Sequence, residues 1–125
     1  MQTVSPVRLQ YEQLPYPPRD PARELDELQV TLLGQLKLAD IAVWGGARRQ
    51  TRTPFRCLDA GCGTGDSAIF MAEQLRSTRA EVVALDLSDA SLEIARQRAE
   101  RRGLDNITFV NASIEDVGSL GLGTF

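Results

Sequence analysis

The feature that most constrains this chain is a run of alternating glycines between an apolar stretch and a helical one. Residues 58–66 read Leu-Asp-Ala-Gly-Cys-Gly-Thr-Gly-Asp, which places glycine at positions 61, 63 and 65. Glycine turns sharply and lets a ligand approach the main-chain amides without a Cβ in the way. Because three alternating glycines weaken a simple connection, the run predicts a strand-to-helix turn that binds a cofactor.

The spacing of these glycines argues against two common cofactor classes. A dinucleotide-binding fingerprint would need its third glycine at position 66, where this chain has Asp66. A phosphate-binding loop of the Walker type would need Gly-Lys-Ser or Gly-Lys-Thr, and the sequence's single lysine is Lys37. The sequence therefore favours neither a nicotinamide or flavin dinucleotide nor a nucleoside triphosphate.

Around the turn, the apolar pattern predicts two successive strand-helix-strand units. Strands are expected at 55–60, 81–87 and 106–111, with helices at 66–75 and 88–102. The second helix has Ser88 as its cap and Gly103 as its stop, with Leu92, Ala95 and Ala99 facing inward. Strands that alternate with helices imply parallel pairing and right-handed crossovers, so the predicted class is α/β.

The N-terminal part follows a different pattern. Five of the six prolines lie within residues 1–21, which predicts an extended arm that is neither helix nor central strand. Apolar residues at helical spacing predict one helix from Ala22 to about Val43, with Asp20 as cap and Gly45-Gly46 as stop. A loop is expected at 47–53. The predicted division is an arm and helix at 1–46 and a cofactor-binding domain at 47–125.

Composition narrows the range of partners. The chain of 125 residues is 42% hydrophobic and 25% charged, with a net charge of −3, which is ordinary for one soluble domain and indicates no nucleic-acid partner. The most basic run, residues 95–102, is expected to be a solvated helix face. The sequence has neither a signal-peptide pattern nor an apolar run near the roughly 18 residues of a membrane span, so a cytoplasmic location is expected.

Cysteine and histidine usage limits the chemistry further. Cys57 and Cys62 fit neither a zinc-ligand spacing nor a redox pair, and both are expected to be reduced. The sequence has no histidine, so the commonest metal ligand and the commonest general base are missing. No metal site is predicted.

Residues 58–65 resemble motif I of the class I S-adenosylmethionine-dependent methyltransferases: acidic residue, x, Gly, x, Gly, x, Gly. The resemblance implies S-adenosylmethionine as cofactor and a Rossmann-like three-layer sandwich whose parallel strands run in the order 3-2-1. It also implies that Asp59 helps to position the amino group of the cofactor. The turn residues expected to bind the cofactor are Gly61, Cys62, Gly63 and Gly65.

The ends of the next two strands supply the remaining expected contacts. Asp86 can accept both ribose hydroxyls, although a carboxylate that only approaches the next helix is the alternative. Leu87 would then press against the adenine. Where the family often has an aspartate for the adenine amino group, this chain has Ser113, a weaker acceptor, followed by the amide of Ile114. Glu115 and Asp116 are expected to be solvated.

Two interpretations of the arm stay open. Its segment 11–21 resembles one that precedes the core in some bacterial class I methyltransferases. Tyr11 and Tyr16 either close the cofactor pocket or pack on the outside of the core.

The resemblance covers residues 55–125, about half of the family core, and Phe125 falls where the family enters its fourth strand. We therefore expect a fragment, or a protein that associates with itself through the exposed edge of its first strand. No residue is assigned as catalytic. The predicted function is the cofactor-binding half of a methyltransferase with an unassigned acceptor. The alternative is a non-catalytic module that binds S-adenosylmethionine or S-adenosylhomocysteine, and Asp66 disfavours an oxidoreductase.

Overall fold

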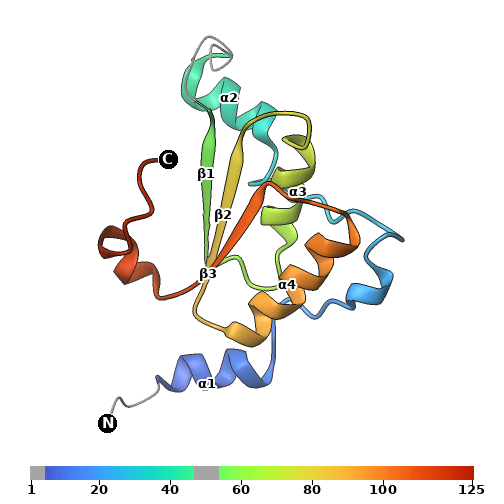
Figure 1. The fold of residues 1–125 in the computed structure, drawn as a ribbon, viewed down its shortest axis with the longest axis vertical. Helices are drawn as coiled ribbons and strands as arrows, with labels where there is room; N and C mark the ends of the chain where they lie inside the picture. The colour runs from blue at the N-terminus through green and yellow to red at the C-terminus, as the bar shows by residue number, and fades with distance from the viewer. Residues whose placement is uncertain (1–4, 47–53) are drawn as a thin grey trace.

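The computed structural model describes residues 5–46 and 54–125 (Figure 1). The loop predicted at 47–53 lies outside the described residues. None of the helices in the described part of the chain has the length and apolar character of a membrane span.

Three parallel strands form one sheet in the order β1-β2-β3 (Figure 1). The strands are β1 (Arg56–Ala60), β2 (Glu81–Asp86) and β3 (Ile107–Asn111). Leu58 pairs with Val83, and Ala84 pairs with Phe109. Residues 82–85 of the central strand are at most 2% exposed, which explains why this strand is an almost unbroken apolar run. The predicted parallel order 3-2-1 and the α/β class are confirmed.

Two helices cover one face of the sheet and contact each other (Figure 1). They are α3 (Asp66–Gln74) and α4 (Asp89–Arg101). Ser88 caps α4 by accepting a hydrogen bond from the Ser91 amide, and Gly103 follows the helix with φ +64°. The inward residues Leu92, Ala95 and Ala99 are all buried, as predicted. The described residues thus supply the sheet and one helical layer of the predicted sandwich.

The arm is not extended throughout. Residues Pro6–Gln13 form helix α1, so the prediction of an extended arm is wrong for them. Pro6 stands in the first turn, where its fixed φ favours a helix, and Leu14 ends the helix directly before Pro15. Residues 14–20 have no regular helix or strand, as predicted. Residues 14–24, which follow α1 and include the short helical turn at Pro21–Arg23, are called the strap below.

The single helix predicted from Ala22 to Val43 is also wrong. Pro21–Arg23 form only a 3₁₀ turn (η1), capped by Asp20 as expected, and helix α2 begins later, at Leu36–Trp44. Between them, the Thr31 hydroxyl accepts a hydrogen bond from the Gly34 amide, a local bond that competes with helix formation. Gly45 ends α2 in the left-handed conformation, as predicted.

The basic run of α4 departs from expectation as well. Arg98 is 1% exposed, so the prediction of a solvated face is wrong at that residue. The strap brings Glu24, itself 5% exposed, to Arg98 and Arg102. The interpretation of the run as solvated failed because its partner lies 74 residues away in the sequence.

The C-terminal residues return to the beginning of β1. After the 3₁₀ helix η3 (Ile114–Ser119), the carbonyls of Leu122 and Thr124 accept hydrogen bonds from the Arg56 guanidinium. The same guanidinium lies 4.8 Å from the centre of the Phe125 ring. Self-association through the edge of β1 stays a prediction.

Candidate functional site

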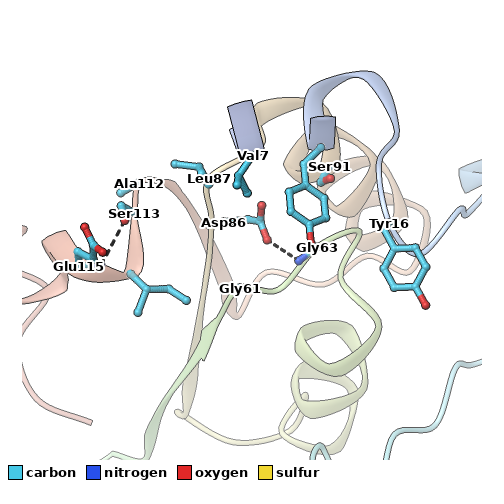
Figure 2. A pocket seen from close by; sticks show the side chains of 12 residues that line it. Val7, Tyr16, Gly61, Gly63, Asp86, Leu87, Ser91, Ala112, Ser113 and Glu115 are labelled. Atoms are coloured by element: carbon cyan, nitrogen blue, oxygen red, sulfur yellow. Dashed lines mark hydrogen bonds between the residues drawn. The ribbon is translucent and has the colours of Figure 1, made fainter. Parts of the chain in front are cut away.

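A cavity of about 380 Å³ opens at the carboxyl ends of the strands (Figure 2). In a parallel α/β sheet this is the end at which ligands usually bind. Its lining includes six of the residues expected from the sequence: Gly61, Gly63, Asp86, Leu87, Ser113 and Ile114. Asp59, Cys62 and Gly65, which were also expected at the site, do not line it.

The three glycines of the turn have different roles. All three have positive φ values, 81° at Gly61, 54° at Gly63 and 100° at Gly65. A Cβ on Gly63 would lie 2.3 Å from the Tyr16 carbonyl oxygen, so this glycine admits the strap. A Cβ on Gly65 would lie 2.9 Å from the Ala95 Cβ, so the third glycine admits helix α4. Two of the three glycines therefore serve close packing within the protein.

Most main-chain amides of the turn already have partners. The Gly61 and Cys62 amides donate to the Leu85 carbonyl, and the Gly65 amide donates to the Cys62 carbonyl. The Gly63 amide donates to Asp86 Oδ2 at 2.8 Å. The turn therefore offers a ligand a surface without side chains, whereas the sequence suggested free amide donors.

Asp86 combines the two roles that the sequence left as alternatives. Its Oδ1 accepts a hydrogen bond from the Ser88 amide at 2.9 Å, so the carboxylate does approach helix α4. It also lines the cavity, and Figure 2 shows it beside Gly63. Each carboxylate oxygen can accept more than one hydrogen bond, so both can still receive hydroxyl donors from a ligand. The Asn111 amide group fixes this strand end by donating to the carbonyls of Asp86 and Leu87.

Asp59 lies below the turn with a buried carboxylate oxygen, Oδ2, that has no hydrogen-bond partner. Burial raises the pKa of Asp59, a hydrogen bond from the Ala68 amide opposes the rise, and the nearby charge of Asp86 adds to it. A buried acceptor without a donor is unfavourable. A cationic hydrogen-bond donor placed beside Oδ2 would supply the missing partner and stabilise the ionised carboxylate.

Cys62 is 7% exposed and does not reach the cavity. Burial, together with the charges of Asp59 and Asp86, raises the pKa of its thiol. The side chain therefore behaves as a small apolar group rather than as a nucleophile. The reduced state of the two cysteines stays a prediction.

Apolar side chains line the cavity after both strands, with Leu87 after β2 and Ala112 and Ile114 after β3. The Ser113 hydroxyl accepts a hydrogen bond from the Glu115 amide at 3.3 Å and so caps η3. Glu115, which was expected to be solvated, lines the cavity although it is exposed. Sequence reasoning also missed Val7, Ser91 and Ala112. Val7 lies in helix α1, which the sequence did not predict. Ser91 could have been predicted, because it lies one helical turn after Ser88, the cap of the predicted helix.

Tyr11 and Tyr16 both line the cavity, so the structure favours the first of the two interpretations of the arm. The Tyr11 carbonyl accepts a hydrogen bond from the Ser88 hydroxyl. The Glu12 carboxylate accepts hydrogen bonds from the Asp89 and Ala90 amides at 2.6 and 3.2 Å. Helix α1 is thus attached to the N-terminus of α4, where a negative charge is favourable.

Comparison with known proteins gives a family match over the region that builds this site. A family described as a methyltransferase domain matches residues 54–123. A ubiquinone/menaquinone biosynthesis C-methyltransferase from Methylobacterium nodulans is 39% identical over 98 residues, 78% of this chain and 38% of that relative. A tRNA 5-carboxymethoxyuridine methyltransferase from Escherichia coli is 42% identical over 65 residues, 51% of this chain and 23% of that relative. The chain therefore spans less than half the length of either relative.

Solved structures show the same fold. A putative O-methyltransferase from Klebsiella pneumoniae has a TM-score of 0.55 at 19% identity, over 94% of this chain and 58% of that chain. An O-methyltransferase from Bacillus cereus in complex with SAH has a TM-score of 0.55 at 20% identity, over 95% of this chain and 56% of that chain. At these identities the likeness is one of fold alone.

Proposed function

Because the chain belongs to the class I S-adenosylmethionine-dependent methyltransferases, we propose that it holds S-adenosylmethionine in the cavity between the glycine turn and the strand ends. The observation that carries the proposal is the meeting of Gly61, Gly63, Asp86 and Leu87 in one cavity. These four residues of the cavity come from two separate segments of the chain, the glycine turn and the end of β2. Its volume of about 380 Å³ lies in the range of small-molecule sites.

The polar groups around the cavity fit this cofactor at both ends. Asp59 does not line the cavity, but its buried and unpartnered Oδ2 would receive the cationic amino group of the methionine part, directly or through a water, once the cofactor is bound. Asp86 would accept the ribose hydroxyls with the capacity that its two oxygens retain. Leu87 and Ile114 would enclose the adenine between apolar side chains.

The bound sulfonium would supply a reactive methyl group, and the protein would supply binding and orientation. In this scheme the described residues hold the cofactor on the glycine turn and cover it with Tyr11 and Tyr16. None of the described residues is assigned to binding the methyl acceptor. The names of the two relatives point to a quinone-pathway compound for one and to a tRNA nucleoside for the other, so they support no single acceptor class.

A non-catalytic module that binds S-adenosylmethionine or S-adenosylhomocysteine is the second candidate. These 125 residues contain no histidine, so any transfer step that they carry out would need a different general base. Binding without turnover on any offered acceptor would support it. The division into 1–46 and 47–125 and the cytoplasmic location stay predictions.

Calorimetric titration with S-adenosylhomocysteine tests the proposal. Asp86→Asn keeps the shape of the side chain but removes its charge, and we expect roughly a hundredfold weaker binding through the loss of charged acceptors. Asp89→Asn is the matched control because Asp89 is 66% exposed and does not line the cavity. Nicotinamide adenine dinucleotide should not bind. A folded wild-type chain that fails to bind S-adenosylhomocysteine would contradict the proposal.

A further inference from the structure

Buried charged side chains join the strap to helix α4 and to the start of α3. The side chains of Arg98 and Glu24 are 1% and 4% exposed. Arg98 Nε donates to Glu24 Oε2, and Arg102 Nε donates to Glu24 Oε1. Arg98 Nη1 donates to the Asp66 carboxylate and to the Thr64 carbonyl, each at 2.8 Å. Every charge in this cluster therefore has a partner of opposite sign.

Such a cluster defines the position of the strap. A buried charge is strongly unfavourable unless a partner compensates it. If the strap left α4, Arg98 would lose Glu24, and Glu24 would lose both of its guanidinium partners. The strap also adds two hydrogen bonds from Arg19 to Asp66, at 2.9 and 2.6 Å. Few other positions of the strap could satisfy these groups together.

The same cluster holds the glycine turn. On one side of Thr64, its carbonyl accepts the bond from Arg98. On the other side, its amide donates to the Tyr16 carbonyl at 3.2 Å and its hydroxyl to the Pro17 carbonyl at 2.6 Å. Thr64, itself fully buried, is thus fixed between α4 and the strap. Its neighbour Gly63 lines the cavity, and so does Tyr16.

We infer that Glu24 and Arg98 are positioning residues for the cofactor cavity, because their buried ion pair sets the strap against the glycine turn. Neither side chain lines the cavity. The inference rests on the proposed function. Its consequence is thermodynamic linkage: if docking of the strap strengthens cofactor binding, cofactor binding must strengthen docking of the strap by the same factor.

Glu24→Gln tests the inference because it keeps the size of the side chain and removes its charge. Glu27→Gln is the matched control, since it removes the same charge from an exposed side chain three residues further on. The wild-type chain and both variants are measured by S-adenosylhomocysteine calorimetry, by thermal melting, and by amide hydrogen exchange of residues 11–24 with and without saturating S-adenosylhomocysteine.

We expect Glu24→Gln to bind S-adenosylhomocysteine about tenfold more weakly and to exchange faster in the strap. Saturating S-adenosylhomocysteine should slow that exchange by about the same tenfold. Glu27→Gln should match the wild type in both measurements. If Glu24→Gln does not fold, Arg19→Gln takes its place, because the ion pair of Arg19 with Asp66 is partly exposed.

The outcomes separate the inference from the proposed function. A lower melting temperature with unchanged affinity would assign the pair to stability alone and overturn the inference. Strap exchange that S-adenosylhomocysteine does not change would overturn it as well. In both cases the wild-type chain still binds. Failure of the folded wild-type chain to bind would instead reject the proposed function, and the inference with it.

Discussion

The two walls of the cavity are built on different physical grounds. The wall formed by the glycine turn and the ends of β2 and β3 rests on buried sheet, and the turn amides other than that of Thr64 are bonded within that unit. The opposite wall, with Val7, Tyr11 and Tyr16, comes from the arm, whose side chains are largely exposed. It is held by carboxylates and guanidinium groups that reach helices α3 and α4. The first wall is therefore formed by the core, whereas the second depends on contacts between residues that lie far apart in the sequence.

The largest expected difference between the walls concerns apolar burial. Leu92 is fully buried in the core cluster beneath the first wall, whereas Leu14 in the strap is 70% exposed. Leu92→Ala should lower the free energy of unfolding by about 3 kcal/mol through lost contacts and a cavity. Leu14→Ala should change it by less than about 0.5 kcal/mol. Urea unfolding measures both, and equal losses would contradict the contrast.

A substitution at Gly63 tests the place where the two walls touch. An alanine there would meet the Tyr16 carbonyl at 2.3 Å in addition to its positive φ, so the strap must move. We expect a loss of stability of about 2 kcal/mol and at least about tenfold weaker S-adenosylhomocysteine binding. Gly103→Ala is the control, because Gly103 has φ +64° but open space around its Cβ position. It should cost about 1 kcal/mol and leave binding unchanged.

The core could be predicted from the sequence because its signals are local. The glycine turn, the Ser88 cap and the Gly103 stop each act within a few residues, and the strand boundaries were met to within one residue. The arm could not be predicted in the same way. Arg98 looked like a solvated side chain because nothing near it in the sequence identifies Glu24 as its partner.

The candidate site was predictable to the same extent and for the same reason. Residues within the turn and at the strand ends were identified, whereas Val7 depended on a helix that the prolines concealed. Gly65 was expected at the cavity but faces Ala95 instead, because the motif does not reveal which glycine serves ligand approach and which serves helix packing.

Asp59, which precedes the glycine turn of the first wall, is expected to lower the stability of the folded chain while it strengthens cofactor binding. Since burial raises the pKa of Asp59, its ionised form is unfavourable in the folded chain at neutral pH. Asp59→Asn should therefore raise the free energy of unfolding by about 1 kcal/mol at pH 7 and weaken S-adenosylhomocysteine binding. Thermal melting and calorimetry on one preparation measure both. A variant that is less stable, or that binds as well as the wild type, would contradict this role.

Glu12 offers a smaller test of how the arm is attached. Glu12→Gln removes the negative charge that accepts bonds from the first amides of α4, and it should cost about 0.5–1 kcal/mol. Glu93→Gln, an exposed change in the middle of α4, is the control. Amide exchange at Asp89 and Ala90 should quicken only in the first variant. Unchanged exchange there would show that α1 is held by other contacts.

The smallest expected effect is a dependence on pH that distinguishes Asp66 from Asp59. Burial pushes the pKa of Asp66 upward, but hydrogen bonds from Arg19 and Arg98 outweigh it and leave the pKa lowered. In acid the unfolded chain then takes up a proton at this residue before the folded chain does. The stability that Asp66 contributes is therefore fully present above its unfolded pKa of about 3.9 and is lost as pH falls through the lower folded value. Urea unfolding between pH 7 and pH 3 should show a shallower acid loss in Asp66→Asn than in the wild type. An equal loss in both would mean that the ion pairs of the strap contribute nothing to acid stability, and the second wall would then be held by its uncharged contacts alone.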